Sequence, residues 1–344
     1  MMKTCLKIFA AAVLALALTV TACACMPTAP SPKEDNCLTV ICTTYAAKEI
    51  AAALTENWLT LPGGHGYDTL NIQILGQAGR DLHSYEPTAA DLVSLYGADL
   101  FVCLGASAEP WAEGALTAVN AKDQVVFDMM EACHGRLLSV GHDGDACEVE
   151  PGHDHEHTHH EDEAYDEHIW MSLKNMMLLT SALSAQLQAM VPHAETLIKE
   201  NEASYLEKLS ALDHAYAQTV AGGQRTQVMI ADRNPFAYLM HDYGITCHAA
   251  FPGCSSETEA SFATQTRLLE TVKGQKLPYV LQTEGGEGAI AATVAQATGA
   301  GVLTLHACQV MTEKQWADVS YLSIMESNLE NLKKALWEDP LSVD

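Results

Sequence analysis

The residues with the clearest chemical character lie between Glu150 and Trp170, where the chain reads EPGHDHEHTHHEDEAYDEHIW. Neutral imidazole is a ligand for zinc, copper, iron and nickel, and short tracts rich in histidine are typical of metal binding. A run of imidazoles and carboxylates this dense must be solvated, so we expect an exposed loop that contacts metal ions. The alternative interpretation is a solvated insert without chemistry. The histidines of this run are His153, His155, His157, His159 and His160.

The charge of the whole chain favours cations as partners. The 18 lysines and arginines are outnumbered by 44 aspartates and glutamates, which gives a formal net charge of -26. Such a chain repels phosphate groups, so no nucleic acid is expected as a partner. A length of 344 residues, 48% of them hydrophobic, is sufficient for two packed domains.

The first residues have the layout of a secretory signal peptide. Lys3 and Lys7 precede an apolar stretch over residues 8–18. This stretch is too short for a membrane-spanning helix. We therefore expect residues 1–22 to direct export, and the mature protein to work outside the cytoplasm.

The end of this segment indicates how the protein is held. Val-Thr-Ala-Cys at 20–23 is similar to a bacterial lipobox, which predicts that Cys23 carries a lipid that anchors the chain to the cell membrane. The alternative is an ordinary signal peptide cut at Ala22 or Ala24. Residues 23–37 are rich in proline, serine and charge, which is typical of a flexible tether.

The cysteines leave their pairing open, although export permits disulfides. Cys133 with Cys147, and Cys254 with Cys308, are candidate bridges, but spacing alone does not decide between pairings. The sequence has no CxxC pair with zinc-finger spacing, which argues against a structural zinc knuckle.

From Leu38 onward, short apolar runs alternate with stretches of helical periodicity. Strands joined by helices pair in parallel, which leaves the loops at their carboxyl ends free to carry ligands. We predict an α/β fold of two similar lobes, each with a mostly parallel four-stranded sheet. The runs expected as strands are 38–44, 70–75, 99–105 and 124–128, then 227–231, 245–251, 278–283 and 301–307.

A long, rigid helix is expected to join the two lobes. Apolar residues at helical spacing continue over 194–221 and end at two consecutive glycines. A helix of about 28 residues would be about 42 Å long. The predicted division is an N-terminal lobe over 38–190, which includes the His-rich loop at 134–167, a linking helix over 191–223 and a C-terminal lobe over 224–344.

Three motifs follow one another in the order known from one protein family. They are RDLHSYEPT at 80–88, DEHIW at 166–170 and YLSIMESNL at 321–329. These resemble the motifs DPHSYEPT, DPHVWL and Y...M..NL of the zinc/manganese solute-binding lipoproteins of ABC importers. Together with the lipobox and the acidic His-rich loop, the resemblance covers the whole mature chain.

The resemblance implies that the chain captures a divalent cation between its lobes and delivers it to the permease and ATPase of an importer. Zinc is the expected cation, with manganese as the alternative. His83 and His168 match the two histidine ligands of the family motifs. The resemblance further implies a lipid-anchored monomer, in which the His-rich loop collects or senses metal with low affinity.

The third ligand position departs from the family pattern. Zinc binders have histidine there and manganese binders have glutamate, but this sequence has Arg233 within DRNPFAY. Arginine stays protonated in proteins and cannot donate a lone pair to a metal. Asp232, the preceding residue, is one replacement, unless it only pairs with Arg233.

Two residues at other strand ends are stronger replacements. His306 falls where manganese-type members have an aspartate, and Glu284 resembles the acidic residue of another family motif. We expect His83, His168 and His306 to bind the metal, with Glu284 as an oxygen ligand or a supporting acid. Three imidazoles favour zinc over manganese.

An enzyme is not expected. The run HDHEH at 153–157 has a superficial likeness to the HxHxD clusters of zinc hydrolases, but a catalytic site needs ligands on a rigid scaffold. The other alternative is an adhesin or surface metal receptor, since lipoproteins of this family have been described that way. The predicted ligands would have no purpose in adhesion.

Overall fold

The computed structural model describes most of the chain from Asn36 to Asp339. The predicted signal peptide, Cys23, His83 and the five histidines of the His-rich run lie outside the described residues. The described ranges are 36–64, 66–76, 85–105, 108–120, 124–139, 165–253, 260–286, 288–309 and 311–339.

The N-terminal sheet consists of four parallel strands in the order β2-β1-β3-β4. Helices connect successive strands, as parallel pairing requires. The strands are β1 (Cys37–Cys42), β2 (Thr69–Ile74), β3 (Leu100–Cys103) and β4 (Val125–Asp128), and the helices that follow them are α2 (Tyr45–Leu54), α3 (Ala89–Tyr96), α4 (Trp111–Ala118) and α5 (Met129–Ala132).

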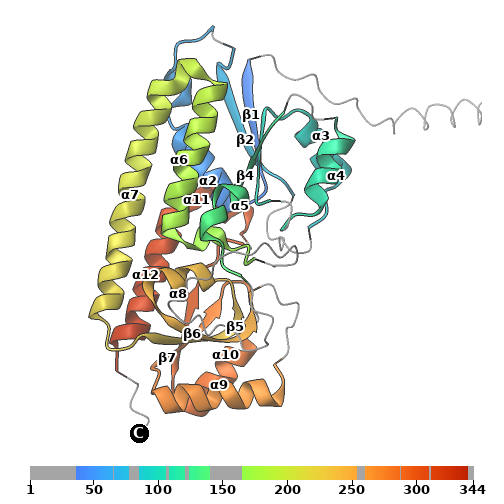
Figure 1. The fold of residues 1–344 in the computed structure, drawn as a ribbon. Coiled ribbons are helices and arrows are strands. Elements are labelled where there is room, and N and C mark those ends of the chain that lie inside the picture. Colours follow the sequence, from blue (N-terminus) through green and yellow to red (C-terminus); the bar gives the residue numbers. More distant parts are fainter. Residues whose placement is uncertain are drawn as a thin grey trace, which may run out of the picture. The chain divides into compact units, whose positions relative to one another are not determined.

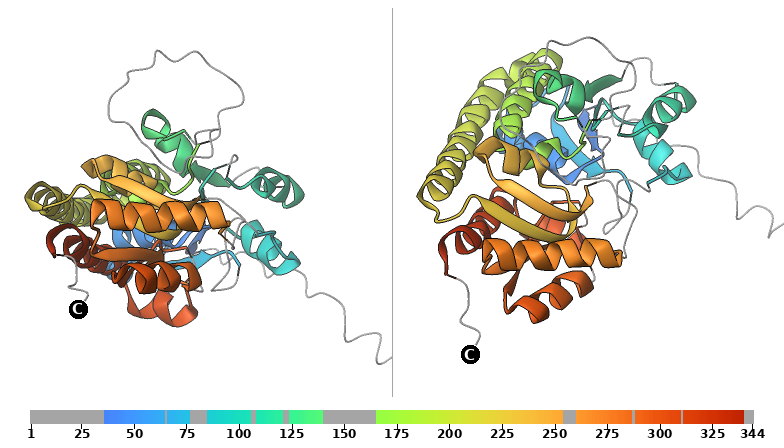
Figure 2. Two further views of the ribbon diagram at one scale, coloured as in Figure 1. Left: turned by 90° about the horizontal axis from the view of Figure 1, so that it is seen from below. Right: turned by 60° about the horizontal axis from the view of Figure 1, so that its bottom comes forward.

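The C-terminal sheet repeats this arrangement with the strand order β6-β5-β7-β8, again all parallel. Its strands are β5 (Gln227–Asn234), β6 (Thr246–Pro252), β7 (Tyr279–Thr283) and β8 (Gly301–Leu305). The connecting helices are α8 (Ala237–Tyr243), α9 (Phe262–Gln275) and α10 (Ala289–Thr298). Figure 2 shows α9, in orange, on the face of this sheet opposite α8.

Long helices join the two lobes. The helix α7 (Glu195–Gly222) has 28 residues and packs against α2, α6 (Leu173–Met190) and α12 (Tyr321–Trp337) (Figure 1). Its buried side chains recur every three to seven residues along one face: Ile198, Tyr205, Leu209, Leu212 and Tyr216. The predicted two-lobed α/β fold with a long connecting helix is confirmed.

Two further observations concern the lengths of the helices. A short helix that the sequence analysis did not anticipate, α11 (Glu313–Asp318), precedes α12 and begins with a capping box at Thr312. Among the described helices, none combines the length and the apolar character that crossing a bilayer requires.

Three hydrophobic clusters explain how the layers are held together. Strand side chains alternate between the two faces of a sheet, so Val40 faces a large cluster that also contains residues of α2, α7 and α12. Ile41 faces the other way, into a cluster with α3 and α4. In the second sheet Ile230 belongs to the large cluster, whereas Met229 packs with α9 and α10. The inner faces of both sheets therefore share one core.

The described cysteines are buried and pack as small core residues. Burial raises the pKa of the Cys103 and Cys133 thiols to about 12, so both remain protonated at neutral pH. The predicted partners of the two candidate bridges, Cys147 and Cys254, lie outside the described residues. The buried cysteines are Cys37, Cys42, Cys103, Cys133, Cys247 and Cys308.

A buried carboxyl group lies at the carboxyl edge of the first sheet. Glu109 is 4% exposed, and its Oε2 accepts a hydrogen bond from the backbone N–H of Leu104 at 2.7 Å. Burial raises the pKa of Glu109 to about 7, although hydrogen bonds from Thr43 and from the backbone of Leu104 and Gly105 act in the opposite direction. The folded protein therefore holds this proton more tightly than the unfolded chain.

Replacing Glu109 by glutamine is expected to change how stability depends on pH. Because the folded pKa lies above the unfolded value of 4.5, the stability that the proton contributes is full below that value and is lost as pH rises to about 7. Relative to Glu109→Gln, the wild type should lose on the order of 3 kcal/mol of unfolding free energy across this window. Urea unfolding at a series of pH values measures the difference. Glu113→Gln, at an exposed position of α4, is the control, and a difference independent of pH would contradict the prediction.

Candidate metal centre

His168 is a buried histidine whose orientation is fixed by an aspartate. It lies just before a short 3-10 helix (Ile169–Met171) and is 0% exposed. Its Nδ1 is 2.9 Å from Oδ1 of Asp166, and the same oxygen accepts the backbone N–H of His168 at 2.8 Å. A carboxylate on Nδ1 holds the proton there and leaves the lone pair on Nε2. This is the usual arrangement around a metal-binding histidine.

The segment around His168 is anchored to the C-terminal lobe on both sides. The indole Nε1 of Trp170 donates to the carbonyl of Ala307 at 2.8 Å. The hydroxyl of Tyr238 donates to the carbonyl of Asp166 at 2.8 Å, and that of Tyr321 donates to the carbonyl of Trp170 at 2.6 Å. These bonds place His168 beside the strand ends of the second lobe.

His306 and Glu284 lie side by side at the ends of β8 and β7. Nδ1 of His306 is 3.2 Å from Oε1 of Glu284, so a carboxylate lies beside this imidazole too, and Nδ1 also accepts the backbone N–H of Cys308 at 3.4 Å. The other oxygen of Glu284 accepts the backbone N–H of Ala307 at 2.7 Å. Asn328 holds the backbone of His306 through two hydrogen bonds, both 2.8 Å long. Glu284 therefore organises the loop after β8 as well as the His306 side chain.

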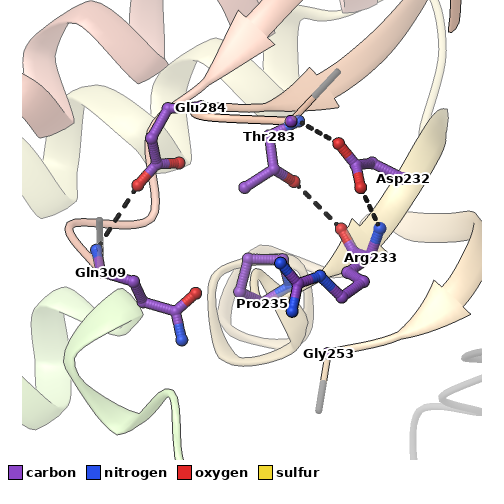
Figure 3. Close-up of a pocket in the computed structure, with 8 residues that line it drawn as sticks. Asp232, Arg233, Pro235, Gly253, Thr283, Glu284 and Gln309 are labelled. Carbon is purple, nitrogen blue, oxygen red and sulfur yellow. Dashed lines mark hydrogen bonds between the residues drawn. The ribbon is translucent and has the colours of Figure 1, made fainter. Parts of the chain in front are cut away.

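A small pocket opens at the carboxyl edge of the second sheet (Figure 3). Its volume of about 20 Å³ is room for a single water molecule or ion. The lining residues are Asp232, Arg233, Pro235, Gly253, Thr283, Glu284, Gly286 and Gln309.

Asp232 and Arg233 both reach this pocket although they are neighbours in one strand. The pairing of β5 with β6 shifts in register between Ile230 and Arg233, which is the signature of a bulge and turns side chains that would otherwise alternate. The carboxylate of Asp232 accepts the backbone N–H of Arg233 at 2.8 Å and that of Thr283 at 3.4 Å. Figure 3 shows the Arg233 guanidinium extending toward Pro235. The Asp232 carboxylate is thus engaged with backbone groups.

The structure brings the predicted ligands together only in part. Asp232 and Glu284 line the same pocket, and His306 contacts Glu284. His168 adjoins this edge, whereas His83 lies outside the described residues. Among the residues that the structure describes, no group of three or more histidines, cysteines, aspartates or glutamates is arranged to hold a metal ion. The complete ligand set stays a prediction.

Gln309 is a site residue that the sequence analysis missed. Its side-chain Nε2 is 2.7 Å from Nε2 of His168, and its backbone N–H reaches Oε1 of Glu284 at 3.4 Å. The preceding residue, Cys308, has a left-handed backbone with φ of 60°, which is unusual for a residue with a side chain. The only sequence signal for Gln309 is its place in the loop that follows a strand.

Gly253 allows the close approach of His168 to the end of β6. A Cβ atom at this position would lie 2.8 Å from the carbonyl oxygen of Asn234 and 3.1 Å from Cε1 of His168. The carbonyl oxygen of Asn234 is part of the backbone and cannot move alone, so a larger residue at position 253 must displace either the strand or the imidazole of His168.

Gly253→Ala is therefore expected to weaken metal binding by about tenfold, because ligand groups must be held within about 0.5 Å of their productive positions. Zinc titration in competition with a chromophoric chelator measures the change. Gly274→Ala, in α9, is the matched control, since a Cβ there meets no atom within 4 Å. Unchanged affinity in Gly253→Ala would mean that His168 takes no part in the site.

The fold and the site define a class of protein: a two-lobed α/β binding protein with polar groups for a small ligand at the carboxyl edges of its sheets. Residues 40–335 match the model of the ZnuA family, described as zinc-uptake complex component A, periplasmic. The chain belongs to this family, and the resemblance carried by its motifs is confirmed. The family comprises transport components, which confirms that the chain is not an enzyme.

Two curated relatives of this chain are named for zinc. The zinc-binding lipoprotein AdcA of Streptococcus pneumoniae is 31% identical over 278 residues, which are 80% of this chain and 54% of AdcA. This chain therefore spans about half the length of that relative. The high-affinity zinc uptake system protein ZnuA of Bacillus subtilis is 26% identical over 270 residues, covering 78% of this chain and 82% of ZnuA.

Among solved structures, the Zn(II)-bound ZnuA-like domain of AdcA from Streptococcus pneumoniae has the same fold. It superposes with a TM-score of 0.67 at 26% identity, and the match covers 88% of this chain and 100% of that domain.

Proposed function

We propose that this chain is the solute-binding component of a metal ABC importer, which captures one divalent cation and delivers it to a membrane permease. The observation that carries the proposal is His168, a fully buried imidazole whose Nδ1 is paired with Asp166 and whose Nε2 is directed toward the pocket residue Gln309. Membership of a zinc-uptake family supports zinc as the cargo, with manganese as the alternative.

The proposed ligands are His83, His168 and His306, and the geometry favours a supporting role for Glu284. The two oxygens of Glu284 already contact His306 and backbone N–H groups, so this carboxylate orients a ligand rather than replacing one. Asp232 faces the pocket with both oxygens bonded to backbone N–H groups, and we assign it a lesser part as an oxygen donor. No bond of the cargo is made or broken, so the site needs no nucleophile or general base.

The partners and the location follow from the same proposal. The permease and ATPase of the importer would accept the cation at the membrane, and a lipid on Cys23 would keep the monomeric chain close to them. Residues 1–22 would be removed on export and 23–37 would act as a tether. The lobes would be residues 38–190 and 224–344, joined by the linking helix at 191–223.

The His-rich run from His153 to His160 is proposed as a low-affinity collector beside the tight site. Its histidines are close in sequence to His168, and carboxylates flank them. The net charge of -26 raises the local concentration of cations around the whole chain.

Metal analysis tests the proposed function directly. The purified chain is expected to contain one equivalent of zinc that resists dialysis, and manganese should compete for it only weakly. A variant without residues 141–164 should keep this equivalent and lose the additional weakly bound zinc. A full-length protein that retains no divalent cation, or that retains zinc only through the deleted segment, would contradict the proposal.

A further inference from the structure

The side-chain amide of Gln309 contacts Nε2 of His168, which is the atom that would bind a metal ion. The two Nε2 atoms are 2.7 Å apart, and His168 is 0% exposed, so this contact lies in an environment shielded from water. Gln309 is one of the eight residues that line the small pocket. Its loop is held in place because Glu284 accepts the backbone N–H groups of Ala307 and Gln309.

The hydrogen-bond network assigns the direction of this contact. Oδ1 of Asp166 is a carboxylate oxygen, which accepts hydrogen bonds and does not donate them, and it also receives the backbone N–H of His168, so the imidazole proton is assigned to Nδ1. Nε2 of His168 is then an acceptor, and the Gln309 amide must present its N–H to it. The lone pair that would bind a metal ion is therefore engaged by an amide donor.

The second predicted ligand shows the same pattern in a weaker form. Nε2 of His306 lies 3.5 Å from the side-chain nitrogen of Gln315. The orientation of that amide is fixed, because its oxygen accepts the backbone N–H and the hydroxyl of Thr312 at 2.8 and 2.9 Å. Each imidazole thus has a carboxylate beside Nδ1 and a glutamine amide on the side of Nε2. Nδ1 of His306 also accepts the backbone N–H of Cys308 at 3.4 Å, so the direction of the amide contact is assigned for His168 alone.

We propose that Gln309 competes with the metal ion for Nε2 of His168 and thereby sets the affinity and the release rate of the site. One lone pair cannot serve an N–H donor and a cation at once, so binding requires the amide to rotate away. When the cation leaves, the amide takes up Nε2 again, which favours the emptied state and assists delivery. This inference rests on the proposed function, because it assumes that His168 binds the cargo.

The experiment compares wild type with Gln309→Ala in two measurements. Zinc affinity is determined by competition with a chromophoric chelator, and the dissociation rate by transfer to excess chelator. An ordinary hydrogen bond shifts an equilibrium by about two- to tenfold, so the Kd should fall and dissociation should slow by that factor. In the metal-free protein, the nitrogen NMR resonance of His168 Nε2 should move, because the bond from the amide is lost.

Two further variants make the result specific. Gln309→Leu keeps a side chain of similar volume that has no hydrogen-bond donor, and it should lower the Kd as Gln309→Ala does. Gln282→Ala is the matched control, because that amide lies two residues from Glu284 but donates to Thr304 Oγ1 at 3.1 Å on an exposed part of the sheet. It should leave the Kd and the His168 resonance unchanged.

The outcomes separate this inference from the proposed function. If wild type binds zinc and Gln309→Ala binds it equally or more weakly, the competition is overturned and the proposed function stands. An unmoved Nε2 resonance in the metal-free variant also overturns the inference. If wild type binds no divalent cation, the proposed function fails, and the inference with it.

Discussion

Replacing His168 by alanine is expected to weaken zinc binding by more than about 100-fold, because even the loss of a group that only supports a ligand weakens metal sites by about 10- to 100-fold. His168 combines complete burial with a carboxylate on Nδ1, so a water molecule cannot easily replace its imidazole. Competition titration with a chromophoric chelator measures the loss.

A surface histidine provides the control for this experiment. His214 is exposed on α7, where its Nδ1 contacts the carbonyl of Ser210, and His214→Ala should bind zinc as the wild type does. Thermal unfolding of the metal-free His168→Ala variant shows whether its fold persists. A folded His168→Ala variant with wild-type affinity would place the tight site elsewhere in the chain.

The second large effect is expected from Arg233→His, which should tighten zinc binding by about tenfold or more. The exchange removes a permanent positive charge from the pocket and places an imidazole at the position that the motif resemblance predicts for a histidine ligand. Even at the dielectric constant of bulk water, a unit charge and a dication about 6 Å apart repel each other by about 1.4 kcal/mol, which corresponds to a tenfold change in affinity. Titration against a tighter chelator measures the gain.

Arg233→Met separates the two contributions to this gain. It removes the charge without supplying a ligand, so its affinity should fall between those of the wild type and Arg233→His. If Arg233→His binds zinc no better than the wild type does, Arg233 does not lie at the metal position, and the prediction that residue 233 is the third ligand position is wrong.

The fold was predictable because its signals are local. The alternation of apolar runs and helical periodicity located the eight strands that the structure describes, and the helix predicted over 194–221 differs from α7 by one residue at each end. The short helices α5 and α11 were not predicted, because helices of four and six residues are too short to show a periodic pattern. The bulge in β5 was equally hidden, because it depends on how β5 pairs with β6.

The site was less accessible to sequence reasoning, because its contacts join distant segments. His306 and Glu284 meet because β7 and β8 are parallel neighbours, a pairing that follows from topology. The contact of Gln309 with His168 spans 141 positions and carries no motif. Arg233 drew attention only because it differs from the residue that the family motif has at the third ligand position. The sequence thus indicated which strand ends carry the candidate ligands, but not which polar groups contact those side chains in the folded protein.

The hydrophobic core that both sheets share determines how the protein is expected to unfold. Residues from Leu38 to Leu336 contribute to one continuous cluster, while the separate clusters with α3, α4, α9 and α10 lie on the outer faces of the sheets. A large apolar interface couples neighbouring lobes. Exposing the inner face of one sheet to water therefore also exposes the inner face of the other. We therefore expect the two lobes to unfold together in one cooperative transition, and we expect neither lobe to fold independently when excised. Where only one lobe opens, we expect the opening to be limited to the helices on the outer face of its sheet.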